Sequence, residues 1–153
     1  MKIRNAFLFL APFFPVLPLS AQQLKPNLPW VDISDWKDHQ TVIAQGTVDL
    51  YNGHPTTVLL DDGHTILAPW SRNHGGPAEF IGKSTDGGQT WTVSTAPAQW
   101  KGMRNCPSIY KLTDPAGKQR LFVFCTMYAE IQGAPNDMCF SYSEDNGQTW
   151  STA

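Results

Sequence analysis

An eight-residue motif occurs twice in the chain and constrains its fold more than any other feature of the sequence. Residues 84–91 read Ser-Thr-Asp-Gly-Gly-Gln-Thr-Trp, and residues 143–150 read Ser-Glu-Asp-Asn-Gly-Gln-Thr-Trp. Both fit Ser-x-Asp-x-Gly-x-x-Trp, and their aspartates, Asp86 and Asp145, lie 59 positions apart. A repeat of this length suits a unit of four strands, such as one blade of a β-propeller. The sequence therefore predicts two consecutive units of the same kind.

Strand and turn signals surround each copy of the motif in the same order. The expected strands are 56–60, 65–68, 79–83 and one beginning at Trp91 in the first unit, and 108–112, 121–124, 138–142 and one beginning at Trp150 in the second. No stretch after Trp30 has a sustained helical period. We therefore predict an all-β chain with two antiparallel units, over residues 52–94 and 105–152.

The spacing within the motif has a structural explanation. In a tight hairpin, a short acidic side chain accepts hydrogen bonds from turn amides, and Gly88 or Gly147 takes the positive φ that other residues resist. Trp91 and Trp150 are expected to fold back onto their units and to be largely buried. A calcium loop of EF-hand type is excluded, because the first copy has only one carboxylate at a usable position. Replacing Asp86 with alanine is thus expected to reduce stability and to affect activity only through folding.

The N-terminal residues differ in character from the rest of the chain. Lys2 and Arg4 precede an apolar run at 6–19, which ends shortly before Ala21 and two glutamines. This order is typical of a secretory signal peptide, and the run is shorter than the roughly 20 residues of a membrane-spanning helix. We expect a secreted or periplasmic protein with no membrane span in the mature chain. The expected organisation is a signal peptide at 1–21, a linker at 22–40 and a partial propeller at 41–153, whose residues 41–51 form an extended outer strand.

Composition and charge exclude several classes of protein. Hydrophobic residues make up 41% and charged residues 16% of the chain, which suits a packed core and not a disordered chain. A net charge of -2, with no cluster of lysine and arginine, argues against a nucleic-acid partner. Cys106, Cys125 and Cys139 lack the spacing of a zinc site, so no metal or cofactor is expected. Cys125 and Cys139 fall in neighbouring predicted strands, where they either form a disulfide or serve as small buried residues.

The repeated motif and its strands resemble the Asp boxes of the sialidase and BNR-repeat superfamily, over roughly residues 52–150. The resemblance implies a six-bladed propeller, of which about two blades stand here as the N-terminal part of a longer protein. It also implies an exo-acting glycoside hydrolase for a terminal, acidic sugar, whose tyrosine nucleophile and two further arginines lie in later blades, so that this portion alone is inactive. Asp boxes also occur in non-catalytic propellers, so binding of glycan or protein is the alternative, and a purely structural β-repeat is a third.

Two segments correspond to functional positions of that family. Where the family has an Arg-Ile-Pro sequence that begins the first blade, this chain has His54 between a glycine and a proline, so the first carboxylate-binding arginine has no counterpart. The loop at 71–79 contains no aspartate where the family places its acid/base. His74 or Glu79 could transfer protons instead, and the alternative is an ordinary loop with a turn at Gly75.

Further candidate residues lie near the predicted strand starts. Arg72 and Arg104, with His54, are candidate substrate-binding residues, because successive blades of a propeller present such positions at one mouth. Each of them alone could equally be a surface residue. Trp70 and Trp100 could stack on a sugar ring, although a role in the core is the favoured assignment. A glycan or glycoconjugate is therefore the expected partner, and ordinary α-sialosides are expected to be poor substrates.

Overall fold

The computed structural model describes residues 31–127 and 137–153, so the expected signal peptide at 1–21 lies outside the described residues. The chain divides into a unit that ends at Asp35 and a compact unit from Trp36 to Ala153. The second unit contains both copies of the motif. It begins with a short 3-10 helix, η1 (Lys37–His39), which has no buried residue.

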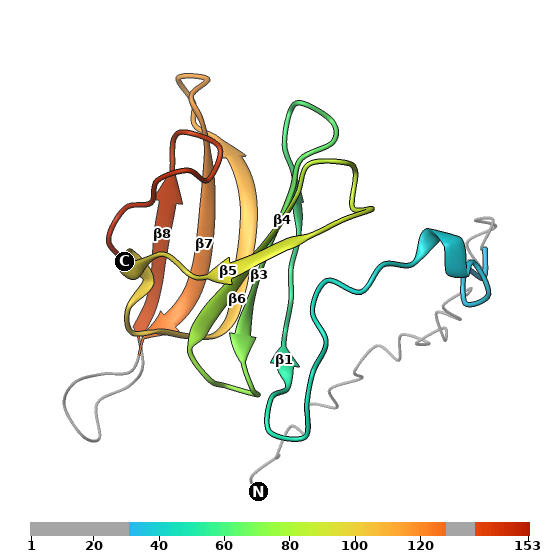
Figure 1. Ribbon diagram of the computed structural model, residues 1–153. Helices are drawn as coiled ribbons and strands as arrows, with labels where there is room; N and C mark the ends of the chain where they lie inside the picture. Colours follow the sequence, from blue (N-terminus) through green and yellow to red (C-terminus); the bar gives the residue numbers. More distant parts are fainter. Residues whose placement is uncertain (1–30, 128–136) are drawn as a thin grey trace, which may run out of the picture. The chain divides into compact units, whose positions relative to one another are not determined.

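The first repeat forms a five-stranded antiparallel sheet (Figure 1). Its strands are β1 (Asn52–Gly53), β2 (Val58–Leu59), β3 (Ile66–Arg72), β4 (Ala78–Ser84) and β5 (Thr92–Thr95). The order of the strands is β1-β3-β4-β5. β2 also pairs with β3, on the same edge as β1: β1 pairs with the last residues of β3, and β2 pairs with its first residues. β1 and β2 thus act as one interrupted strand. Counted in this way, the sheet is an antiparallel meander of four strands, as predicted.

The second repeat forms a three-stranded antiparallel sheet. Its strands are β6 (Met103–Thr113), β7 (Gln119–Met127) and β8 (Asp137–Ser143), in that order. Beyond β8, the amide of Ser151 donates to the carbonyl of Tyr142 at 2.8 Å, in the register that Thr92 of β5 takes with Lys83 of β4. The predicted all-β fold is confirmed, with antiparallel sheets that do not close into a barrel in the described residues.

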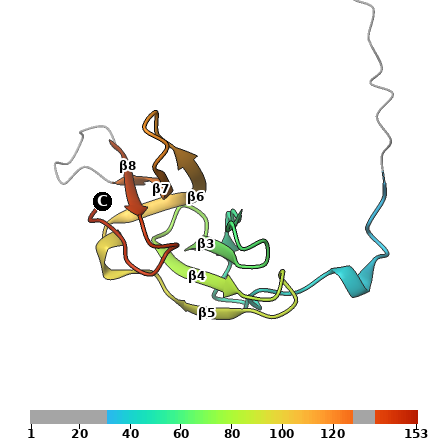
Figure 2. The same ribbon diagram turned by 90° about the horizontal axis from the view of Figure 1, so that it is seen from above.

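The two sheets pack against each other around a shared core (Figure 2). The buried apolar residues come from both sheets and from the helix η2 (Ala98–Trp100) between them. They are Leu60, Leu67, Ala78, Trp100, Met103, Ile109, Leu121, Val123, Cys125 and Trp150. A polar link crosses the same interface, because the Thr56 hydroxyl donates to the carbonyl of Pro107 at 2.9 Å and accepts from the Ile109 amide at 3.0 Å. The favoured core role of Trp70 and Trp100 is confirmed, since both are 2% exposed.

The opposite face of the second sheet carries a group of aromatic side chains, here called the aromatic face. Its members are Tyr110, Phe122, Phe124, Phe140 and Tyr142. Neighbouring ring centroids lie 5.7–6.0 Å apart, as in aromatic clusters of protein cores. Tyr110, Phe140 and Tyr142 are nevertheless exposed. The second sheet is therefore apolar on both faces, although only one face is covered by the described chain.

Both motifs form the same hydrogen-bonded turn, as predicted. Asp86 accepts from the Thr90 amide at 2.9 Å, and Asp145 accepts from the Thr149 amide at 2.8 Å. In each turn the motif serine donates to the aspartate and accepts from the motif glycine, whose φ is +90° in the first copy and +83° in the second. The tryptophan indole nitrogen donates to the carbonyl of that glycine. The motif is therefore a self-contained structural element.

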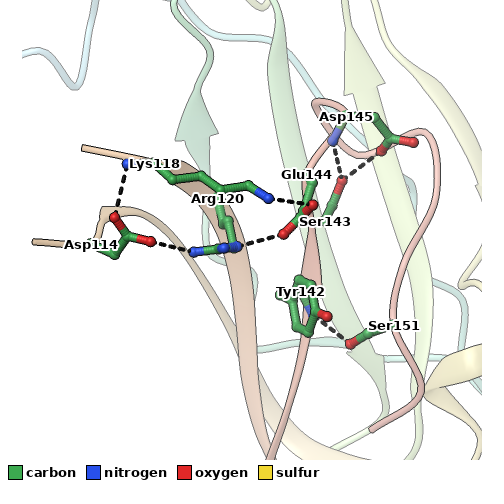
Figure 3. A network of polar contacts seen from close by, with 8 residues as sticks. All are labelled: Asp114, Lys118, Arg120, Tyr142, Ser143, Glu144, Asp145 and Ser151. Carbon is green, nitrogen blue, oxygen red and sulfur yellow. Dashed lines mark hydrogen bonds and ion pairs between the residues drawn. The ribbon is translucent and has the colours of Figure 1, made fainter. Parts of the chain in front are cut away.

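An ion-pair network lies beside the second motif (Figure 3). Arg120 of β7 donates to Asp114 at 2.9 Å and to Glu144 at 2.7 Å, and Lys118 also pairs with Glu144 at 2.7 Å. These residues tie the turn between β6 and β7 to the residue that precedes Asp145. The network is at the surface, so it orients the two turns more than it stabilises them.

The prediction of largely buried tryptophans holds fully for the second motif and to a lesser degree for the first. Trp150 is 7% exposed and makes an edge-to-face contact with Trp100, at 4.9 Å between ring centroids. Trp91 is only half-buried. A Cβ at Gly82 would contact both Trp91 and Ile43, so the segment before β1 covers part of that side of the first sheet. Trp150 belongs to the core shared by the two sheets and η2, and Trp91 does not.

The expected outer strand at residues 41–51 is also wrong. Thr47 and Leu50 exchange backbone hydrogen bonds of 2.9 and 3.3 Å in a tight turn, which uses the polar groups that an outer strand would offer to a neighbour. Tyr51 instead bonds to Asn73, beside the start of the first sheet. The segment is held by this turn, by the hydrogen bonds of Tyr51 and by a hydrogen bond from the Asn52 side chain to the Ala44 carbonyl at 3.3 Å.

Candidate functional site

Two histidines from separate loops of the first sheet meet at one end of β3. The pairing of β1 with β3 places Gly53 opposite Ser71, so that His54 after β1 lies beside His74 after β3. His54 Nε2 and His74 Nδ1 are 2.9 Å apart, and the ring centroids are 4.8 Å apart. One of the two nitrogens must carry the hydrogen between them. The two imidazoles therefore act as a linked pair, in which one donates and the other accepts.

The loop that carries His74 is fixed on several sides. A Cβ at Gly76 would lie 1.7 Å from the carbonyl oxygen of Arg72, so only glycine fits there. Asn73 has a φ of +58°, and its amide donates to the Tyr51 carbonyl at 2.7 Å. The amide of Asn105 donates to the Gly76 carbonyl at 2.9 Å. Both sheets thus hold the loop in place.

A pocket of about 460 Å³ lies beside the histidine pair, where the loops of His54 and His74 meet the second sheet. Its lining combines polar groups with apolar side chains from the second sheet. The residues are His54, His74, Asn105, Cys106, Ser108, Phe124, Cys125, Thr126 and Met138. The volume is in the range of small-ligand sites, and such a mixture can hold the hydroxyl groups and the apolar face of a sugar ring. We call it the histidine pocket.

The other predicted site residues do not line this pocket. Arg104 is half-buried behind the loop, and its Nη2 donates to the Gly75 carbonyl at 3.5 Å. Arg72 is exposed, and its Nε pairs with Glu79 Oε2 at 3.0 Å. Glu79 lines a separate pocket of about 400 Å³ near Trp100. The structure therefore brings His54 and His74 together, places Arg104 against their loop, and separates the two predicted proton-transfer residues.

Two residues of the pocket, Asn105 and Cys106, were not among the predicted site residues. Pro107 takes the place of Pro55 in the second repeat, so by position Cys106 corresponds to His54, although the residues before the two prolines differ. Asn105 has a φ of +75°, and its side-chain amide donates to the Thr126 hydroxyl at 3.1 Å. The shared proline was the signal that could have added them to the site.

The pocket offers hydrogen-bonding groups from both sheets. In residues 31–127 and 137–153, no three histidine, cysteine or acidic side chains are grouped so that they could hold a metal ion. Burial raises the pKa of the Cys125 thiol to about 12, so this pocket residue stays protonated at neutral pH. The chemistry available is that of imidazole, amide and hydroxyl groups.

Comparisons with known proteins add no relative. Neither the family models nor the curated proteins nor the solved structures gave a match to this chain. Across the described ranges, no helix combines the length and the apolar character that crossing a bilayer requires.

Proposed function

We propose that this protein is an exported, sialidase-like glycoside hydrolase that acts on a terminal sugar, with an acidic sugar as the favoured substrate. In this proposal the two sheets are consecutive blades of an Asp-box propeller. The histidine pocket forms part of the substrate site, and the nucleophile and further arginines come from other blades. Export rests on the sequence of the first 21 residues.

The packing of the sheets supports the propeller. Leu67, Pro69 and Ile81 of the first sheet occupy the positions that Phe122, Phe124 and Phe140 occupy in the second, as the strand registers align with the motifs. In the first sheet these positions are covered by the second sheet. In the second sheet they form the aromatic face, which suits a further blade of the same kind.

The single observation that carries the proposed chemistry is the contact between His54 and His74 at the edge of a sugar-sized pocket. A neutral imidazole can both donate to and accept from a sugar hydroxyl. His74 is assigned the proton transfer, because an imidazole can both take up and release a proton. His54, held by its partner ring, is suited to orienting the substrate.

A second function, glycan binding without hydrolysis, is favoured by a different observation. Glu79 is paired with Arg72 and lines another pocket, so that the histidine pocket receives no carboxylate from this candidate acid. Glycoside hydrolysis generally needs such a group or a tyrosine nucleophile. A non-catalytic propeller would need only the hydrogen-bonding groups of the pocket.

Histidine variants test the site. In the full-length protein, His54→Ala and His74→Ala are each expected to weaken glycan turnover or binding by at least about tenfold, because each removes one ring of the pair. The matched control is His64→Ala. His64 is an exposed histidine in the turn before β3, at the far end of that strand. Binding to a panel of neutral and acidic oligosaccharides is measured by calorimetry, and sugar release is measured by chromatography.

The three possible results separate the two functions. Sugar release by the wild type that falls in His74→Ala supports the hydrolase. Binding without release, lost in both variants, supports the non-catalytic function. Binding and release that are unchanged in both variants, or vigorous cleavage of an ordinary α-sialoside independent of both histidines, would overturn the assignment of this pocket.

A further inference from the structure

Two cysteines lie directly opposite each other on neighbouring strands of the second sheet. Cys125 of β7 and Cys139 of β8 are register partners in an antiparallel ladder. Directly opposite residues in such a ladder have their side chains on one face and their Cα atoms about 4.5 or 5.5 Å apart. Both spacings fall within the roughly 4.4–6.8 Å range of disulfide-bonded cysteines. The backbone is therefore already placed for a bond between the two sulfur atoms.

The surroundings of the two thiols differ from those of the third. Cys125 is buried in the core, and Cys139 is half-buried and packs against the same core. Cys106 is exposed and lies where the ladder between β6 and β7 is interrupted, between Arg104 and Ser108. Cys106 therefore has no register partner in β7. Geometry favours Cys139 over Cys106 as the partner of Cys125.

We propose that Cys125 and Cys139 form a disulfide in an oxidising compartment, whereas Cys106 remains a thiol in the histidine pocket. The oxidant is a small disulfide such as oxidised glutathione. A thiolate of the pair attacks it, releases one reduced glutathione and leaves a mixed disulfide on the protein. The second thiolate then attacks the protein sulfur and releases the other glutathione. Two protein thiols are oxidised, and one glutathione disulfide is reduced to two thiols.

Burial makes this reaction slow in the folded chain. It raises the pKa of Cys125 to about 12 and also raises the pKa of Cys139, so both thiolates are scarce at neutral pH. Because the thiolate is the attacking species, the bond is expected to form mainly while the chain folds. After folding, the same burial protects the bond from attack by external thiols.

Mass spectrometry tests the pairing. The chain is refolded in a glutathione redox buffer, free thiols are alkylated with iodoacetamide, and the protein is digested without reductant. The expected products are a peptide pair joined through Cys125 and Cys139, lighter by two hydrogen atoms than the separate peptides, and an alkylated Cys106. The oxidised protein should also melt several degrees above the reduced protein, since the bond constrains the unfolded chain.

Matched variants separate the possible outcomes. Cys106→Ser should keep both the linked peptide and the higher Tm, whereas Cys139→Ser should lose both. A link through Cys106, or alkylation of all three cysteines after complete equilibration, would overturn the proposal. The peptide analysis of the wild type decides the matter even if a variant fails to fold.

Discussion

At the scale of single residues, the two motif aspartates are held strongly by the hydrogen bonds of their own turns. The hydroxyl of Thr90 and then its amide lower the pKa of Asp86 to about 2, and Thr149 does the same for Asp145. Each carboxylate is ionised when its turn is formed. The turns therefore depend on pH in a direction that the hydrogen bonds determine.

We expect stability to fall as the pH is lowered from about 3.8 to about 2. A folded-state pKa below that of the unfolded chain adds stability above the unfolded value, and this contribution is lost as pH falls through the folded value. The double variant Asp86→Asn/Asp145→Asn should be less stable at pH 6 and show a shallower acid dependence. Urea unfolding across this range measures both effects. Asp49→Asn is the control variant. If the stability of the double variant depended on pH as steeply as that of the control, the prediction would be contradicted.

A glycine of the second motif has a further role, because the motif presses against the first sheet. A Cβ at Gly147 would lie 2.6 Å from a methyl carbon of Leu67, whose side chain is buried, so that moving it would disturb the packing of the core. Gly147→Ala should cost about 1–2 kcal/mol for the left-handed backbone and about 1–3 kcal/mol more for overpacking. Gly117→Ala is the matched control, since Gly117 has a φ of +82° and nothing within 4 Å of its added carbon. Equal losses in thermal unfolding would show that the clash is relieved.

At the scale of elements, the second sheet is stabilised mainly through one face. Leu121 of β7 is 3% exposed on the covered face, whereas Leu112 of β6 is 43% exposed. Leu121→Ala should therefore lower the free energy of unfolding by about 2–5 kcal/mol, and Leu112→Ala by less than about 1 kcal/mol. Chemical denaturation of the two variants makes the comparison. Similar losses would mean that the other face is also covered in solution.

The strands could largely be predicted from the sequence, because their signals are local. Alternating apolar residues between turns placed most of the predicted strands, although β6 and β7 extend several residues beyond the expected limits. The strand expected to begin at Trp150 is wrong, because the second sheet has three strands and only Ser151 continues the pairing with β8. The segment at 41–51 was mispredicted for the opposite reason. Its apolar residues suggested a strand, but a turn between Thr47 and Leu50 satisfies the backbone locally.

The candidate site could be predicted only in part, since it depends on how distant segments meet. The meeting of His54 and His74 followed from the expected arrangement of strand starts. Arg72 and Glu79 form an ion pair with each other and do not line the pocket. The repeat pattern of the sequence contains nothing that predicts this ion pair. The difference between Trp91 and Trp150 was equally hidden, because their local sequences match and only their neighbours differ.

At the scale of the whole molecule, each of the two sheets packs against the other. Leu67 of the first sheet lies against Gly147 of the second motif, and the second sheet covers the face of the first sheet that contains Leu67. Stability in such arrays belongs to the contacts between neighbours as much as to each repeat. The aromatic face of the second sheet continues this pattern beyond the described contacts.

The contact between Gly147 and Leu67 also has a consequence for the order of events during synthesis. A ribosome releases the residues of the first sheet before those of the second motif, so Leu67 has already emerged when Gly147 is made. When folding proceeds from the N-terminus, each new sheet can pack against residues that have already been synthesised. In a circularly permuted chain the second repeat would be made first. Its apolar face would then stay exposed to water until the first sheet was synthesised.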